Sequence, residues 1–239
     1  MIHALHGNFG LPSDWDAALP PGVPAKAWHL WEIRRHHPET HTLSGFAAWF
    51  NNQITALPPD PCRILAGYSL GGRLALHVLA DRPLLWHRVL LLSTHPGLAN
   101  ETGRSERLVH DLSWQIRSQQ DPWVEVCDSW TAQPVLQGPG TPPDLLPMES
   151  WRQEIAGAFD GWSLGRQQGV LAFPGALKIR GGWMTGGADS KFSELALKGC
   201  GALPGFIPET VPHAGHRLLT SHPDAVGAAL ARLLRQAQG

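Results

Sequence analysis

The sequence predicts an α/β fold, in which helices cover a mostly parallel sheet and a helical cap is inserted into the sheet-forming part. Two observations lead to this prediction. Short apolar runs alternate with segments that carry apolar residues at helical spacing, which is typical of parallel strands joined by crossover helices. Between residues 95 and 174 this alternation stops, and helical pieces separated by Pro and Gly loops replace it.

Each expected element follows from its local pattern. The apolar runs predict strands at residues 1–5, 28–31, 63–66, 88–92, 177–184 and 206–211. Helical spacing predicts helices at residues 43–57, 71–80, 190–198 and 223–236. The interrupting segment is expected to hold helices at 106–118, 122–130 and 149–159, and an exposed Pro- and Gly-rich loop at 137–144. We therefore expect one domain, residues 1–239, with a cap at 95–174.

Composition excludes several classes of protein. The 239 residues include 19 Lys and Arg against 20 Asp and Glu, so no basic face is indicated for nucleic acid or anionic membranes. The spacing of Cys62, Cys127 and Cys200 fits neither a disulfide framework nor a zinc site and favours a reducing cytoplasm. The start of the chain lacks the pattern of a signal peptide, and no apolar run approaches the length of a membrane span. No metal or organic cofactor is indicated, and the oligomeric state is left open.

A G-x-S-x-G run, Gly67 to Gly71, lies between a predicted strand and a predicted helix. This context predicts a nucleophile elbow, a sharp strand-to-helix turn that exposes Ser69 above the sheet. Glycines are expected at both ends of the run because side chains there would collide with neighbouring backbone. Ser69 is therefore the predicted catalytic serine of an α/β-hydrolase fold.

Two backbone N–H groups are expected to form an oxyanion hole near Ser69. The N–H of Leu70 lies at the start of the helix, where the helix dipole favours negative charge. The other donor is expected from the loop after the first strand, and we assign it to Asn8. His6 in the same loop is interpreted as a structural residue.

A serine needs a histidine to activate it and a carboxylate to hold that histidine in the correct tautomer. Asp189 and His216 follow the last two predicted strands, in the chain order that this fold uses. Two alternatives remain open. Asp189 can instead be only the N-cap of the following helix, and His213 competes with His216, although Gly215 favours His216 by permitting a close approach.

Further motifs are spread along the chain and join the serine run. They are 67–73 (GYSLGGR), 93–98 (STHPGL), Glu106-Arg107 with Asp111 and Trp114, Trp130 with 133–135 (QPV), 163–167 (SLGRQ) and 189–192 (DSKF). Together they make the chain similar to the 2-succinyl-6-hydroxy-2,4-cyclohexadiene-1-carboxylate (SHCHC) synthase family, the MenH-type enzymes of menaquinone or phylloquinone synthesis. The similarity extends from His6 to His216.

This resemblance implies a lyase that removes pyruvate from a succinylated enolpyruvyl cyclohexene carboxylate to form SHCHC, without an acyl-enzyme. It implies that Ser69 acts as a base through His216, that Asp189 orients His216, and that the N–H groups of Asn8 and Leu70 hold the developing oxyanion. It also implies a small-molecule carboxylate as the binding partner. Substrate-contacting positions of the family match Tyr68, Arg73, Arg107 and Trp130.

The residues themselves support part of this interpretation. Arg73 lies one helical turn after Ser69, and a substrate with several carboxylates needs guanidinium groups. Each assignment also has a structural alternative. Arg73 can be a solvated helix residue, Arg107 can pair with an aspartate four positions later, and Tyr68 and Trp130 can be packing residues.

The sequence departs from the family in two places. An arginine that the family uses between Trp130 and Ser163 has no secure match here, and Arg152 and Arg166 are the candidates. The strand before Asp189 is richer in glycine than the family's usual pattern. A carboxylester or thioester hydrolase with the same three residues is therefore the alternative function, and a binding module that has kept the fold without catalysis is the third hypothesis.

Overall fold

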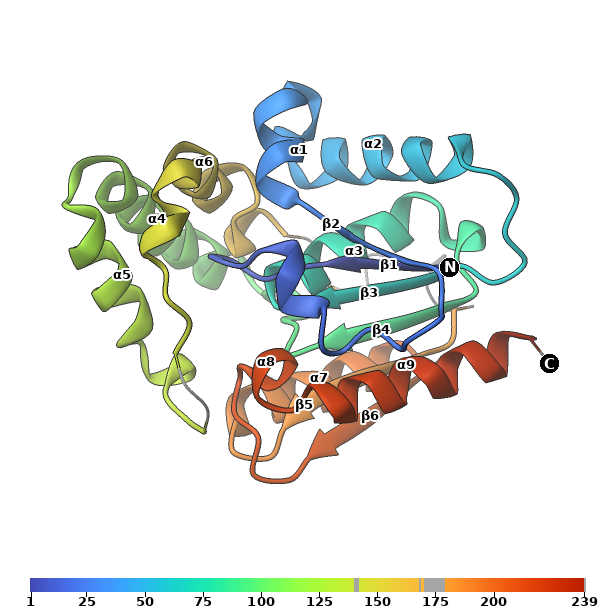
Figure 1. Ribbon diagram of the computed structural model, residues 1–239. Coiled ribbons are helices and arrows are strands. Elements are labelled where there is room, and N and C mark those ends of the chain that lie inside the picture. Colours follow the sequence, from blue (N-terminus) through green and yellow to red (C-terminus); the bar gives the residue numbers. More distant parts are fainter. Residues whose placement is uncertain (140–141, 168, 170–178, 239) are drawn as a thin grey trace.

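The computed structural model describes residues 1–139, 142–167, 169 and 179–238. Within these residues six parallel strands form one sheet in the order β2–β1–β3–β4–β5–β6 (Figure 1). Their bounds are β1 Ile2–Leu5, β2 Ala25–Trp28, β3 Ile64–Tyr68, β4 Arg88–Leu92, β5 Gly181–Gly186 and β6 Phe206–Val211. The α/β class predicted from alternating strands and helices is confirmed.

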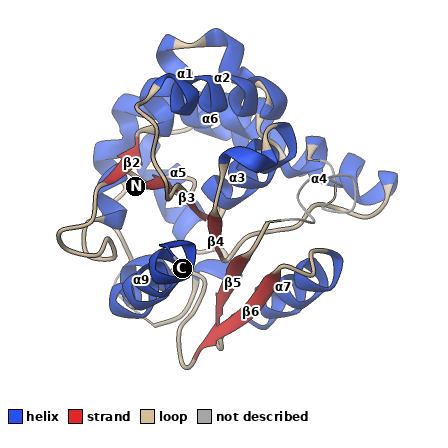
Figure 2. Cartoon of the chain, turned by 90° about the vertical axis from the view of Figure 1, so that its right-hand side faces the viewer, coloured by secondary structure: helices blue, strands red, loops and turns tan. Residues whose placement is uncertain are grey.

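The helices lie on both faces of this sheet (Figure 2). Their bounds are α1 Leu30–His36, α2 Leu43–Ala56, α3 Leu70–Asp81, α7 Ser190–Ala202, α8 Leu218–Ser221 and α9 Pro223–Gln238. Successive residues of β3 point to opposite faces, so Leu65 packs into a core with α2, α3 and α7, whereas Ile64 packs into a second core with α8 and α9. Because both faces are covered, the central strands β3 and β4 are largely apolar rather than alternating.

Three helices lie between β4 and β5 in the sequence: α4 Glu101–Gln120, α5 Trp123–Thr131 and α6 Arg152–Gly161. They gather beyond the carboxyl ends of the strands (Figure 1). The expected helices at 106–118, 122–130 and 149–159 correspond to them, with different ends. The cap limits of 95–174 stay a prediction, because residues 170–174 lie outside the described part of the chain.

One expected strand is wrong. Residues 28–31 were expected to be extended, but β2 ends at Trp28 and α1 begins at Leu30. The His29 ring accepts a hydrogen bond from the N–H of Glu32 at 3.3 Å and so caps the helix. The apolar run hides this boundary, because Trp and Leu suit either a strand or a buried helix and neither Gly nor Pro marks the change.

The glycine-rich strand β5 has a specific packing reason. A Cβ atom on Gly181 would lie 2.4 Å from the carbonyl oxygen of Val89 on β4, so only glycine allows this approach. The expected strand at 177–184 includes residues 177 and 178, which are outside the described residues. Among the described helices, none is long and apolar enough to cross a membrane.

Candidate active site

Ser69 occupies the sharp turn between β3 and α3. Its backbone has φ 51° and ψ −107°, a strained conformation for a residue with a side chain. A Cβ atom on Gly67 would lie 2.5 Å from the carbonyl oxygen of Gly71, and one on Gly71 would lie 2.2 Å from that of Leu5. The turn therefore needs both glycines, as the sequence predicts, and it presents Ser69 at the N-terminus of α3.

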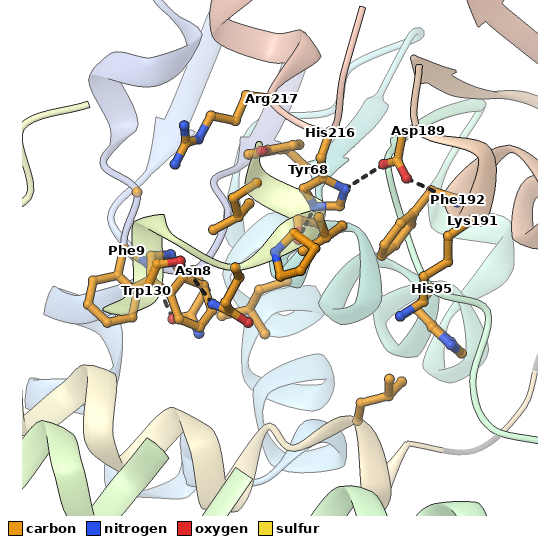
Figure 3. Close-up of a pocket in the computed structure, with 18 of the residues that line it drawn as sticks. Asn8, Phe9, Tyr68, His95, Trp130, Asp189, Lys191, Phe192, His216 and Arg217 are labelled. Carbon is orange, nitrogen blue, oxygen red and sulfur yellow. Dashed lines mark hydrogen bonds and ion pairs between the residues drawn. The ribbon is translucent and has the colours of Figure 1, made fainter. Parts of the chain in front are cut away.

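The structure brings Ser69, His216 and Asp189 together at the carboxyl ends of the strands (Figure 3). His216 Nε2 lies 3.3 Å from Ser69 Oγ, and His216 Nδ1 lies 2.8 Å from Asp189 Oδ2. His216 and Asp189 are buried, with 5% and 8% of their surfaces exposed. A carboxylate at this distance favours the tautomer with Nδ1–H, which leaves Nε2 free to accept the serine proton.

Asp189 also caps a helix, and His213 lies apart from Ser69. The carboxylate of Asp189 also caps α7, because its Oδ1 accepts from the N–H of Phe192 at 3.3 Å. One oxygen of Asp189 thus caps α7, and the other orients His216. His213 is exposed, whereas His216 is the histidine that contacts Ser69.

The loop after β1 lies beside Ser69. Asn8 and Leu70 both line the pocket that contains Ser69, which is compatible with their predicted role as oxyanion donors. The loop is held in a tight turn, in which the N–H of Gly10 donates to the carbonyl oxygen of Gly7 at 3.2 Å and Phe9 has a φ of 53°.

The buried His6 side chain holds this loop in place through hydrogen bonds. Burial lowers the pKa of His6 to about 3, so the ring is neutral at pH 7. Its Nε2 accepts from the N–H of Leu30 at 3.0 Å, which requires that the proton is on Nδ1, 2.9 Å from the carbonyl oxygen of Gly7. With both nitrogens occupied, His6 connects the loop to α1, in agreement with its interpretation as a structural residue.

The pocket has a volume of about 710 Å³ and an aromatic wall. Phe9 stacks on Trp130 with ring centroids 4.5 Å apart, and Trp114 meets Trp130 edge to face at 5.2 Å. These rings join the loop after β1 to α4 and α5, so the cap helices are packed against the core at this site. Trp130 therefore lines the pocket and also packs in its wall.

Arg73 and Arg107 form a cationic group on the α4 side of the pocket. Arg107 Nε donates to Asp111 Oδ1 at 2.7 Å, and the other oxygen of Asp111 accepts from Ser163 Oγ at 2.7 Å. Arg73 donates through Nη1 to the carbonyl oxygen of Trp162 at 2.8 Å. Burial, followed by the nearby charge of Arg107, lowers the pKa of Arg73 to about 9, which still leaves it charged at pH 7.

His95 lies in the same group as a neutral donor. Burial and then the charge of Arg73 lower the pKa of His95 to about 3. Its Nδ1 accepts from the N–H of Gly97 at 3.0 Å, so the proton of the neutral ring is on Nε2. Tyr68 also lines the pocket, its ring centroid is 5.9 Å from that of His216, and burial raises the pKa of its phenol.

The two arginine candidates of the cap lie elsewhere. Arg152 donates to the backbone carbonyl oxygens of Ser118 and Asp121, and Arg166 pairs with Asp160 at 2.6 Å; neither lines the pocket. Some of the residues that line it were not assigned from the sequence, among them His95, Lys191, Phe192 and Arg217. The first three belong to motifs quoted above, and Arg217 is the immediate neighbour of His216, so each had a signal in the sequence.

Comparisons with known proteins agree with this geometry. Residues 4–229 match the model of a family described as "Alpha/beta hydrolase family". The chain is 32% identical over 231 residues to 2-succinyl-6-hydroxy-2,4-cyclohexadiene-1-carboxylate synthase of Pectobacterium atrosepticum, covering 92% of this chain and 88% of that protein. Two solved structures share the fold. MenH from S. aureus has a TM-score of 0.78, 17% identity and coverage of 100% and 94% of the two chains. The carboxylesterase CesB from Bacillus subtilis has a TM-score of 0.63, 20% identity and coverage of 98% and 82%.

Proposed function

We propose that this chain eliminates pyruvate from a succinylated enolpyruvyl cyclohexene carboxylate. It belongs to the alpha/beta hydrolase family and, within that family, to the SHCHC synthases, which catalyse a lyase-type reaction. The product is SHCHC, an intermediate of menaquinone or phylloquinone synthesis. One observation carries the proposal. Ser69 shares its pocket with two guanidinium groups, those of Arg73 and the partly exposed Arg107, and the carboxylate of Asp111 compensates only one of these two charges. A polycarboxylate substrate supplies the missing negative charge.

The triad then acts as a base rather than as a nucleophile. Ser69 Oγ takes the ring proton next to the succinyl ketone, while His216 Nε2 takes the hydroxyl proton of Ser69. The electron pair of the broken C–H bond forms an enolate, whose oxygen is held by the N–H groups of Asn8 and Leu70. Asp189 stabilises the imidazolium of His216 through its bond of 2.8 Å.

Collapse of the enolate completes the elimination. Its electrons restore the ketone and form a second ring double bond, and the bond between the ring carbon and the enolpyruvyl oxygen breaks. The departing enolate of pyruvate takes the proton from His216, which returns the triad to its starting state. Atoms balance without water, metal or redox cofactor, because the substrate splits into SHCHC and pyruvate.

The polarity of the pocket distinguishes this reaction from simple ester hydrolysis. An apolar ester has no use for Arg73 and Arg107, and the desolvation of Arg73 is costly when no anion is bound. The second candidate is a carboxylester or thioester hydrolase, which the same triad and the likeness to CesB favour. We place the enzyme in the cytoplasm, a proposal supported by three buried, unpaired thiols, Cys62, Cys127 and Cys200.

The decisive experiment measures pyruvate release and the ultraviolet absorbance of the cyclohexadiene product from the succinylated enolpyruvyl substrate. We expect turnover by the wild-type protein and a loss of about 10³-fold or more in kcat for Ser69→Ala. Ser105→Ala, at an exposed position of α4, serves as the matched control and should retain full activity. Failure to release pyruvate, together with rapid hydrolysis of short aryl esters that depends on Ser69, would replace the lyase by the hydrolase.

A further inference from the structure

Arg217 is a cationic residue of the pocket whose guanidinium contacts neither the triad nor the described residues of the cap through a hydrogen bond or ion pair. It directly follows His216 and lines the same cavity as Tyr68 and Ser69. In residues 1–139, 142–167, 169 and 179–238, no hydrogen bond or ion pair engages its guanidinium group. This contrasts with Arg107, which is paired with Asp111, and with Arg73, which donates to the carbonyl oxygen of Trp162.

Arg217 is separated from the other pocket cations. After burial, the charges of Arg73, Arg107 and Lys191 lower the pKa of His95, so these three cations lie near that ring. The charge of Arg217 acts on Tyr68 instead. In Figure 3 the guanidinium of Arg217 lies on the same side of the His216 ring as Asn8, and His95 and Lys191 lie on the other side. Arg217 and Lys191 therefore lie on different sides of the His216 ring.

The free guanidinium is also partly withdrawn from solvent. Burial lowers the pKa of Arg217, yet no described carboxylate offsets that cost. Asp14, which also lines the pocket, uses Oδ2 to accept from the N–H of Leu11 at 3.1 Å and forms no ion pair with Arg217. An arginine held in this way is prepared for an anion that comes from outside the chain.

We propose that Arg217 binds the terminal carboxylate of the substrate's succinyl chain, opposite the carboxylates held near Arg73 and Arg107. This inference rests on the proposed function, because it assumes that the succinyl ketone oxygen lies at the N–H of Asn8. From that ketone two methylene groups lead to the carboxylate, on the side of the pocket where Arg217 lies. A planar guanidinium can hold both carboxylate oxygens, which fixes the chain and hence the ring proton that faces Ser69.

The side chain of Arg217 can be changed without removing the local backbone support. The turn after His216 is held by the main-chain carbonyl oxygen of Arg217, which accepts from the N–H groups of Thr220 and Ser221 at 3.1 Å and 3.0 Å. The hydroxyl groups of Thr220 and Ser221 donate to the same oxygen. Substituting the guanidinium leaves all of these bonds available, so a loss of binding reports on the side chain.

Two stable ligands test the proposal by calorimetry without any turnover. One is 2-succinylbenzoate, which has a ring carboxylate and a succinyl chain, and the other is 2-butanoylbenzoate, in which a methyl group replaces the terminal carboxylate. We expect the wild-type protein to bind the first about 10- to 100-fold more tightly, the range for a charge-assisted hydrogen-bonded pair. Arg217→Gln should abolish this preference and leave the affinity for 2-butanoylbenzoate within about twofold.

Two further variants sharpen the result. Arg217→Lys keeps the charge but not the planar pair of donors, so it should retain only part of the preference. Arg235→Gln removes the same charge from the exposed end of α9, outside the pocket, and should retain all of it. With the enolpyruvyl substrate, Arg217→Gln should raise KM by a similar factor, whereas Arg235→Gln should leave KM at the wild-type value.

The outcomes separate the two proposals. An unchanged preference in Arg217→Gln, or an equal loss of affinity for both ligands, would overturn the assignment of Arg217. A wild-type protein that shows the preference but releases no pyruvate would overturn the proposed reaction, and the ratio of the two affinities in Arg217→Gln would still decide the carboxylate site.

Discussion

Replacing Asp189 separates two tasks that one carboxylate performs. Oδ2 accepts from His216 Nδ1 at 2.8 Å, and Oδ1 accepts from the N–H of Phe192 at 3.3 Å. In Asp189→Asn the side chain has a single oxygen acceptor. If that oxygen continues to cap α7, the NH₂ group faces His216 and forces the proton onto Nε2, where it blocks transfer from Ser69.

The two effects differ in size. Loss of the correct tautomer lowers kcat by about 10³- to 10⁴-fold, which corresponds to about 4 to 5.5 kcal/mol of transition-state stabilisation. Asp189→Ala loses the orientation of His216 as well as the N-cap, so we expect a similar fall in kcat and about 1 kcal/mol less stability than Asp189→Asn. Thr42, which accepts from the N–H of Gly45 at 3.0 Å, offers a matched cap outside the pocket.

Pyruvate release measures the first effect and denaturant unfolding measures the second. Thr42→Ala should lower the free energy of unfolding by about 1 kcal/mol and leave kcat unchanged. Wild-type kcat in Asp189→Asn would refute the view that this carboxylate orients His216. Equal stability of Asp189→Ala and Asp189→Asn would refute the view that the retained oxygen caps α7.

Two further predictions concern stability. Burial lowers the pKa of His3 to about 4 and that of His6 to about 3, against about 6.5 in the unfolded chain, so the unfolded state binds more protons below pH 6.5. The contribution of each ring to stability is therefore fully present above pH 6.5 and falls by about 2 kcal/mol between pH 7 and pH 5. Denaturant unfolding should show a weaker pH dependence for His3→Gln than for the wild-type protein. Gly71→Ala should prevent formation of the turn, because the new Cβ would lie 2.2 Å from a backbone oxygen of β1. Gly201→Ala in α7 has no atom within 4 Å of the new Cβ and should raise the unfolding temperature, because alanine reduces the conformational freedom of the unfolded chain. Calorimetric unfolding measures both effects, and a Gly71→Ala protein as stable as the wild type would contradict the packing argument.

Sequence reasoning was most successful where backbone geometry dictates residue type. The G-x-S-x-G turn requires glycine on steric grounds, so Ser69 could be placed from the pattern alone. Asp189 and His216 follow different strands, yet parallel strands bring their carboxyl ends to one edge of the sheet. Their proximity to Ser69 was therefore predictable from chain order.

The cap was less predictable, because its side chains are positioned by contacts between distant segments. Arg152 was a candidate for substrate binding, but its guanidinium donates to the carbonyl oxygen of Ser118 in α4 and to that of Asp121 just after this helix. Arg107 shows the opposite case. Its pairing with Asp111 at i, i+4 was the structural alternative, yet the paired guanidinium still lines the pocket. One contact thus does not decide between a structural and a binding role.

The cationic side chains of the pocket, rather than its triad, are the features that favour a lyase over a hydrolase. Ser69, His216 and Asp189 can serve either reaction, because both begin with transfer of the serine proton. Arg73 and Arg217 are different, since burial lowers the pKa of each guanidinium and no described carboxylate pairs with either one. The fold keeps these cations at a cost in stability that a bound carboxylate offsets. Under the proposed function, a substrate that pairs with both Arg73 and Arg217 carries at least two carboxylates, whereas the substrate of a simple esterase needs none.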